Sequence, residues 1–202
     1  MVYNQIMKTT IFNTPLLSSA LHLLARLSLR LIGWKVEGRF PDLDKFVVIG
    51  APHTSNWDFM LFLAVIFTLR TNVRFMGKAE LFNSPFGWFF YWCGGVPVDR
   101  SKSTGLVEQM VDACQRAKQF ILVIAPEGTR SHVREWKMGF YHIARSAGIP
   151  IVYAAVDGIR KKVNVGQVFQ PGEDAEADLK AIKGYFAGRT GIKPRKEITL
   201  EE

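Results

Sequence analysis

A histidine and an aspartate stand five positions apart in the segment APHTSNWDFM, between two apolar stretches. Pro52 keeps the residue before it extended, so the preceding strand cannot continue directly into a helix. Ser55 and Asp58 have the spacing of a capping box, which predicts a helix that begins at Asn56. His53 then lies outside the helix, where its ring can fold back onto the Asp58 carboxylate. Asp58 would fix the tautomer while the other ring nitrogen accepts a proton, so the pair predicts a general base.

The alternative interpretation is that Asp58 only caps the helix and His53 has no chemical role. Given the numbers of histidines and aspartates in the chain, this spacing arises by chance in about one such sequence in six. The spacing alone therefore does not identify a function.

Charged side chains also follow other predicted strands. Lys78 and Glu80 follow the strand candidate VRFMG, and Asp99 with Arg100 follows the apolar segment GGVPV. Each of these junctions, taken alone, is consistent with an ordinary polar turn or an exposed ion pair. In open α/β sheets, however, ligands bind outside the carboxyl ends of the strands. Several polar junctions of this kind therefore predict a shared ligand site.

The segment APEGTRS follows the apolar strand FILVI. Gly128 permits a close approach of the backbone to a ligand, and Arg130 offers a planar set of donors suited to phosphate. Glu127 is placed to orient Arg130 or another basic group. The alternative is again a polar turn at a strand exit. The coincidence of this segment with the other junctions favours a ligand site.

The order of these blocks resembles the glycerolipid acyltransferase family, whose best-known members are the 1-acylglycerol-3-phosphate acyltransferases. The family pattern is H-x(4)-D, a G-x-x-x-[DR]-R-like block, E-G-T-R, and an apolar strand with a proline. Here the blocks are His53 with Asp58, GVPVDR at 95–100, EGTR at 127–130 and GIPIV at 148–152. Pro52 departs from the asparagine that many members have before the histidine.

The resemblance implies an O-acyl transfer. His53, held by Asp58, would take the proton of a lysophospholipid hydroxyl, which attacks the thioester of acyl-CoA or an acyl-carrier protein. The first-choice acceptor is 1-acylglycerol 3-phosphate, giving phosphatidic acid; the alternatives are glycerol 3-phosphate, another lysolipid or an aminolipid precursor. The thioester is a co-substrate, and neither a cofactor nor a metal is implied. The expected substrate-binding residues are Lys78, Arg100, Glu127, Gly128, Thr129 and Arg130.

Apolar periodicity predicts strands that alternate with helices. Strands are expected at 34–40, 46–51, 73–77, 120–125 and 149–156, and helices at 16–34, 56–69, 104–119, 136–148 and 176–188. The segments FILVIA and IPIVYAAV are wholly apolar, which is typical of strands buried on both faces. We therefore expect an α/β fold with a mostly parallel or mixed central sheet flanked by helices, plus an N-terminal amphipathic helix.

The N-terminal region has no acidic residue before Glu37. In its predicted helix, His22, Arg26 and Arg30 follow one another at intervals of four residues, and the remaining positions are mostly apolar. Two arginines near the middle make a membrane span costly, so we expect a helix that lies on a membrane surface. The alternative is a helix docked on the protein's own core.

The composition limits the classes of partner that we expect the protein to bind. The net charge of +8 and the pI near 9.6 favour an anionic partner such as lipid headgroups, phosphorylated metabolites or nucleic acid. No nucleic-acid motif is present, so membrane lipids and the acyl donor are the expected partners. The two cysteines form no disulfide or metal pattern, which is typical of a reducing compartment. We divide the chain into a membrane-associating segment, 1–35, and an acyltransferase domain, 36–202, placed peripherally on the cytoplasmic face of the membrane.

The stretch LFNSPFGWFFYWCGG, at 81–95, is rich in aromatic residues. One helix face cannot bury them all, so part of the stretch is expected to line an acyl groove or to sit at a bilayer interface. Two rival functions stay open at this point. One is a thiol hydrolase that uses Cys93 with His53, although Cys93 has no basic neighbour to lower its pKa. The other is a non-enzymatic basic protein that binds a membrane surface or nucleic acid.

Overall fold

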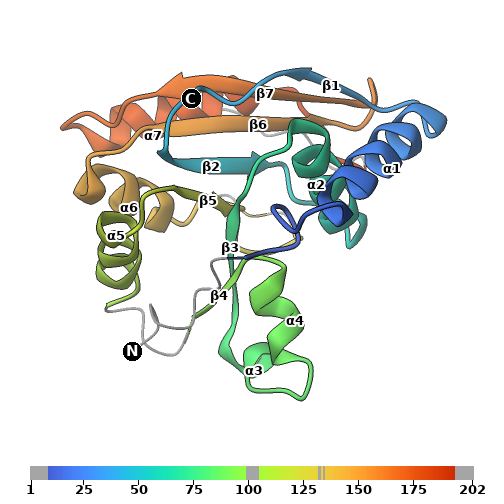
Figure 1. The fold of residues 1–202 in the computed structure, drawn as a ribbon. Coiled ribbons are helices and arrows are strands. Elements are labelled where there is room, and N and C mark those ends of the chain that lie inside the picture. Colours follow the sequence, from blue (N-terminus) through green and yellow to red (C-terminus); the bar gives the residue numbers. More distant parts are fainter. Residues whose placement is uncertain (1–8, 99–104, 132, 134, 194–202) are drawn as a thin grey trace.

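The computed structural model describes residues 9–98, 105–131, 133 and 135–193. Within them seven strands form one sheet, in the order β1-β7-β6-β2-β5-β3-β4 (Figure 1). The strands are β1 (Lys35–Gly38), β2 (Lys45–Ala51), β3 (Arg74–Lys78), β4 (Gly95–Val98), β5 (Phe120–Ile124), β6 (Ile151–Asp157) and β7 (Lys162–Phe169). The helices are α1 (Leu17–Leu31), α2 (Trp57–Leu69), α3 (Ala79–Phe82), α4 (Gly87–Trp92), α5 (Leu106–Arg116), α6 (Gly139–Ala147) and α7 (Ala175–Phe186).

The sheet is mixed. Strands β6, β2, β5, β3 and β4 are parallel to one another, whereas β7 pairs antiparallel with β6 and β1 pairs parallel with β7. The predicted α/β class, with a mixed central sheet flanked by helices, is confirmed. Because β2, β3, β4 and β5 all run the same way, the loops that follow them leave from one edge of the sheet. The charged segments expected at strand exits lie on that edge wherever the structure describes them.

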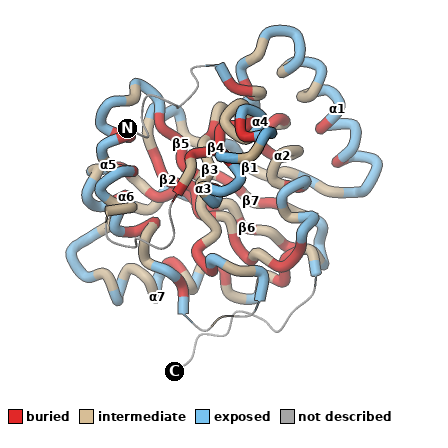
Figure 2. Tube along the Cα trace, turned by 90° about the horizontal axis from the view of Figure 1, so that it is seen from below, coloured by how far each residue is buried: buried red, intermediate tan, exposed pale blue. Residues whose placement is uncertain are grey.

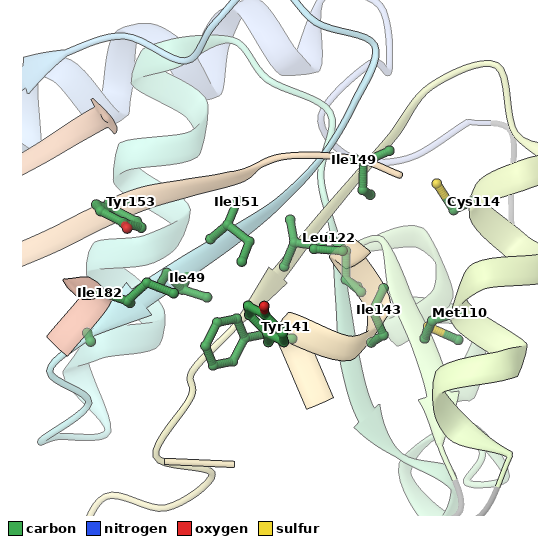
Figure 3. Packing of buried hydrophobic residues seen from close by; sticks show 14 of the residues in the cluster. Ile49, Met110, Cys114, Leu122, Tyr141, Ile143, Ile149, Ile151, Tyr153 and Ile182 are labelled. Atoms are coloured by element: carbon green, nitrogen blue, oxygen red, sulfur yellow. The ribbon is translucent and has the colours of Figure 1, made fainter. Parts of the chain in front are cut away.

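Helices cover both faces of the sheet, and alternation along β2 shows why. Val47 and Ile49 belong to a core cluster with helices α5, α6 and α7, whereas Phe46 and Val48 belong to a cluster with α1 and α2. Figure 3 shows the first cluster, in which Ile49 lies near residues of neighbouring strands and helices: Leu122, Ile151, Tyr141 and Ile182. Fully burying such a side chain stabilises the fold by roughly 1.5–3 kcal/mol. Two-sided burial is what the wholly apolar strands predicted.

Helix α1 is docked on the domain by one side only. Ala25 and Leu29 are buried, and His22 Nδ1 donates a hydrogen bond to the carbonyl oxygen of Phe67 in α2, at 2.8 Å. Large apolar side chains on other positions of the helix and just after it are exposed: Leu23, Leu24, Leu27, Leu31 and Ile32. In Figure 2 most of the α1 tube has the colour of exposed residues. The docking alternative therefore holds for one side of α1, and the opposite side is exposed. None of the helices in the described ranges is both long and apolar enough to cross a membrane.

Candidate active site

The loop between β2 and α2 is held by the first turn of the helix. Asp58 Oδ2 accepts hydrogen bonds from the backbone N–H groups of Thr54 and Ser55, both at 2.6 Å. The Ser55 hydroxyl accepts from the N–H of Trp57 at 3.2 Å. The capping box is thus formed in part: Asp58 reaches back as predicted, but the serine bonds Trp57 in place of Asp58. The helix accordingly begins at Trp57, one residue later than expected.

The ring of His53 meets the carboxylate of Asp58, as the sequence predicted. His53 Nδ1 lies 2.8 Å from Asp58 Oδ2. An ionised carboxylate only accepts hydrogen bonds, so Nδ1 carries the hydrogen and Nε2 of the neutral ring keeps its lone pair. The side chain of His53 is 29% exposed and that of Asp58 only 11%, so the ring is accessible while the carboxylate is largely covered. Such a pair is chemically able to act as a general base with an orienting carboxylate.

Glu127 lies beneath His53, just after β5. The residue is only 8% exposed, and both carboxylate oxygens accept from the backbone N–H of His53, each at 3.0 Å. Burial raises the pKa of Glu127 to about 7, against the opposing effect of the hydrogen bond from His53. The pairing of β2 with β5 brings the two loops together. Glu127 therefore contacts the backbone of His53, whereas the resemblance implied a contact with the acceptor's phosphate.

The rest of the EGTR segment lies at the surface. Gly128 has a φ of 65°, and a Cβ there would lie 2.9 Å from Cδ of Lys137 and 3.2 Å from its Nζ. The segment is tied to this lysine because Lys137 N–H donates to the carbonyl oxygen of Pro126 at 2.8 Å. The hydroxyl of Thr129 accepts from the N–H of Ser131 at 3.2 Å. The phosphate-binding role of Gly128 and Thr129 stays a prediction.

Three cations face solvent along this edge. Arg130 and Lys137 are exposed in the loop that follows β5, and Lys78 is exposed at the end of β3. None of them makes a hydrogen bond or ion pair through its side chain with another described residue. Asp99 and Arg100 lie outside the described residues, so the role expected for Arg100 is untested.

Lys137 is a candidate site residue that the sequence reasoning missed. The apolar pattern placed it inside a helix at 136–148, but α6 begins only at Gly139. Trp136 and Lys137 instead close the loop that starts with EGTR, and Trp136 is buried in the core. The sequence does show a lysine directly after a large apolar residue and just before a helix. Its contact with Gly128, however, depends on how the loop folds back.

An apolar cavity of about 190 Å³ opens beside the histidine. Among the described residues that line it, only His53 and Asp58 are polar; the others come from α2, from the facing strands and the loops that follow them, and from Phe40. Aromatic lining is supplied by Phe40, Phe59 and Phe62, and the described part of the stretch 81–95 contributes nothing to it. The cavity is smaller than the ~300–1,000 Å³ typical of sites for whole drug-sized ligands, so it suits part of an apolar chain.

Small residues on neighbouring strands create this cavity. Gly50 of β2 pairs with Ala154 of β6, and Ala125 directly follows Ile124, the partner of Ile49. Gly50, Ala125 and Ala154 all line the cavity below α2. No atom lies within 4 Å of the position that a Cβ on Gly50 would take. Because the side chains of these three residues are small or absent, a gap remains here between α2 and the sheet.

The thiol of Cys93 is unsuited to nucleophilic chemistry. Cys93 and Cys114 are both buried free thiols, and burial raises the pKa of each. A reactive cysteine requires the opposite shift, because the thiolate is the nucleophile. The geometry therefore disfavours the thiol hydrolase alternative. Within the part of the chain that the structure describes, no group of three or more His, Cys, Asp or Glu residues is placed to hold a metal ion.

Residues 34–157, which include the His53–Asp58 pair and the EGTR segment, match the family model described as Acyltransferase. The chain belongs to the acyltransferase family. The resemblance inferred from the motifs is thereby confirmed. Within this acyltransferase the matched region runs from the residue before β1 to the last residue of β6, so it covers the catalytic candidates and most of the sheet.

Relatives of this acyltransferase carry a specific name. Proteins named 1-acyl-sn-glycerol-3-phosphate acyltransferase are 30% identical over 147 residues in Haemophilus influenzae and 31% identical over 157 residues in Escherichia coli. These alignments cover 68% and 73% of this chain, but 60% and 62% of the two proteins. The chain thus spans about three-fifths of the length of the curated relatives it matches.

A solved structure shares the fold. The crystal structure of the 1-acyl-sn-glycerophosphate (LPA) acyltransferase from Thermotoga maritima superposes with a TM-score of 0.59, covering 84% of this chain and 76% of that one. The two sequences are 18% identical, so this similarity concerns the fold alone.

Proposed function

We propose that this acyltransferase moves a fatty acyl group from acyl-CoA or an acyl-carrier protein to the free hydroxyl of a lysophospholipid. The first-choice acceptor is 1-acylglycerol 3-phosphate, which would give phosphatidic acid. The observation that carries the proposal is the accessible His53–Asp58 pair at the mouth of an apolar cavity. The names of the relatives support the choice of acceptor.

The proposed reaction is a single displacement at the thioester carbonyl. Nε2 of His53 takes the proton of the acceptor hydroxyl as its oxygen attacks, and Asp58 stabilises the positive charge that forms on the ring. A C–O bond forms and the C–S bond breaks, and the proton then passes from the imidazolium to the departing thiolate. General-base catalysis by a positioned residue contributes about 10²–10⁴-fold to the rate. No covalent enzyme intermediate is needed, because the thiolate is a good leaving group.

The acyl chain of the donor needs an apolar surface, whereas the phosphate of the acceptor needs cations. The site has residues of both kinds. The apolar cavity would hold the proximal part of the acyl chain, so that its carbonyl lies beside His53. The exposed cations on this edge of the sheet would bind the phosphate of the acceptor: Arg130, Lys137 and Lys78. Arg130 is suited to two parallel hydrogen bonds with phosphate oxygens, whereas the lysines act as point charges.

The proposal includes peripheral attachment at the cytoplasmic face of a membrane. Exposed apolar residues at the start of α2, directly after the His53 loop, support it: Trp57, Phe59 and Met60. The exposed leucines of α1 add a second apolar surface, and Arg26 and Arg30 line a groove beside them that is suited to anionic headgroups. Buried free thiols accord with a reducing compartment. Co-sedimentation with anionic vesicles, weakened by Leu24→Asp with Leu27→Asp, would test this attachment; equal binding by the variant would contradict it.

A thiol-release assay tests the reaction itself. Purified protein is mixed with acyl-CoA or acyl-carrier protein and with a panel of lysophospholipids, glycerol 3-phosphate and an aminolipid precursor. We expect release that depends on 1-acylglycerol 3-phosphate and that His53→Ala abolishes without loss of helix content in circular dichroism. The exposed His142 of α6 provides the matched control, because His142→Ala should leave the rate unchanged. Near-normal turnover by His53→Ala would overturn the mechanism.

A further inference from the structure

Two carboxylates hold the histidine, and they hold different parts of it. Asp58 of α2 contacts the imidazole ring through Oδ2, at 2.8 Å. Glu127 contacts the backbone N–H of the same residue with both oxygens, each at 3.0 Å. The mechanism above uses only the first of these contacts. The second joins segments that lie 74 residues apart in the sequence.

We propose that Glu127 is a positioning residue: its carboxylate anchors the backbone of His53 so that the ring faces Asp58 and the cavity. This inference rests on the proposed function, because it concerns the base of that reaction. It differs from the phosphate-binding role that the family resemblance implied for this glutamate.

Glu127 lies in a short turn at the end of a strand that is paired within the sheet. It comes three residues after Ile124, the last residue of β5, and β5 pairs directly with β2, which ends at Ala51 just before the His53 loop. The turn that carries it is closed by the hydrogen bond from Gly128 N–H to the Ala125 carbonyl oxygen, at 3.1 Å. A side chain that is held by a paired strand can restrict the position of a loop residue more than the loop alone would.

The same geometry makes Glu127 a poor ligand for phosphate. Only 8% of the residue is exposed, and both oxygens already face the His53 N–H. An ionised carboxylate would also repel a phosphate group placed next to it. Arg130 and Lys137, in the same loop, are exposed and positively charged, so neither burial nor charge opposes their binding to phosphate.

Anchoring does not require the negative charge. A protonated carboxyl group still offers a carbonyl oxygen to the N–H of His53, and so does the amide of glutamine. The charged or titratable groups that act on Glu127 from the facing loop and helix are His53 and Asp58. Glutamine should therefore replace Glu127, whereas methionine, which has similar length but is a poor acceptor, should not.

The experiment compares Glu127→Gln and Glu127→Met in the full chain. Initial rates of thiol release are measured while the acceptor concentration is varied. We expect Glu127→Met to lower kcat by 10-fold or more with the acceptor KM within twofold of wild type, and Glu127→Gln to retain kcat within about threefold. A raised acceptor KM with unchanged kcat would overturn the proposal and place Glu127 at the acceptor. Equal loss in both variants would overturn it as well, since it would show that the charge and not the acceptor atom matters.

A second readout does not depend on turnover. Nitrogen-15 NMR of the imidazoles, with the His53 signals assigned from His53→Ala, reports which ring nitrogen carries the hydrogen. We expect one dominant Nδ1–H form in wild type and Glu127→Gln, and a mixture of tautomers in Glu127→Met. An unchanged His53 spectrum in Glu127→Met would refute the positioning role. If Glu127→Met does not fold, a changed His53 spectrum in Glu127→Gln would refute it instead. Absence of acyl transfer by the wild-type protein would refute the proposed function but leave this NMR comparison intact.

Discussion

The absence of a side chain at Gly50 leaves room in the cavity that we propose for the acyl chain, so a side chain there should shorten the chain that the enzyme accepts. Gly50 lies on β2 and lines the cavity, and no atom stands within 4 Å of the position of a Cβ. Its φ is outside the left-handed region, so a leucine can be introduced without backbone strain. The new side chain would occupy space that we assign to the donor's methylenes.

The expected fall in kcat/KM for a long donor follows from the apolar burial that its acyl chain loses. A leucine side chain has about four carbon atoms, so it displaces about four methylenes of a long chain, each worth about 0.8 kcal/mol when buried. The loss is about 3 kcal/mol, which corresponds to a reduction in kcat/KM of about a hundredfold. A donor too short to pass the level of Gly50 loses little of this burial. The ratio of kcat/KM for palmitoyl and hexanoyl donors should therefore fall about a hundredfold in Gly50→Leu.

Thiol release with the two donors at a fixed concentration of acceptor measures this ratio. Gly184→Leu is the matched control, because Gly184 also has open space at its Cβ position but lies exposed on α7, away from the cavity. Retained activity with the hexanoyl donor shows that the catalytic pair is intact. An unchanged donor ratio in Gly50→Leu would refute the assignment of the cavity to the acyl chain.

Three further predictions test other parts of the site. Asp58→Asn should lower kcat by about 10²–10⁴-fold with little change in KM, because the neutral amide stabilises the imidazolium less; a rate near wild type would remove Asp58 from the mechanism. The pKa of Glu127 is raised from 4.5 to about 7, so its carboxyl group stays protonated to a higher pH in the folded state than in the unfolded state. Wild type should therefore lose up to about 3 kcal/mol of unfolding free energy relative to Glu127→Gln between pH 4 and 8, as urea titrations would show, and parallel pH curves would contradict this. Arg130→Ala and Lys137→Ala should each raise the KM of a phosphorylated acceptor with kcat nearly unchanged, whereas Lys180→Ala, an exposed lysine of α7, should not; a lowered kcat at constant KM would instead place either residue at the reacting centre.

Short-range features of the site were predictable because the forces that form them act within a few residues. The contact between His53 and Asp58 depends on a proline that stops the strand and on a carboxylate that caps the next helix, and all of these lie within one short loop. The same is true of the buried strands β5 and β6, whose unbroken apolar sequence requires cover on both faces. Strand β7 was missed, because KVNVGQVF mixes polar residues and glycine with valines. Its pairing with β6 and with the distant β1 determines its structure.

The sequence by itself determined the α/β class, the order of the family's motifs and the local geometry of the His53–Asp58 pair. Only the tertiary structure decided that Glu127 holds the backbone of His53, that Lys137 lies over Gly128, and that a cavity opens beside the pair. The reason is that each of these features joins segments from different strands or loops. No periodicity within one segment records which strands will be neighbours, or at which level the small residues Gly50 and Ala154 will meet. The register of the sheet supplies that information.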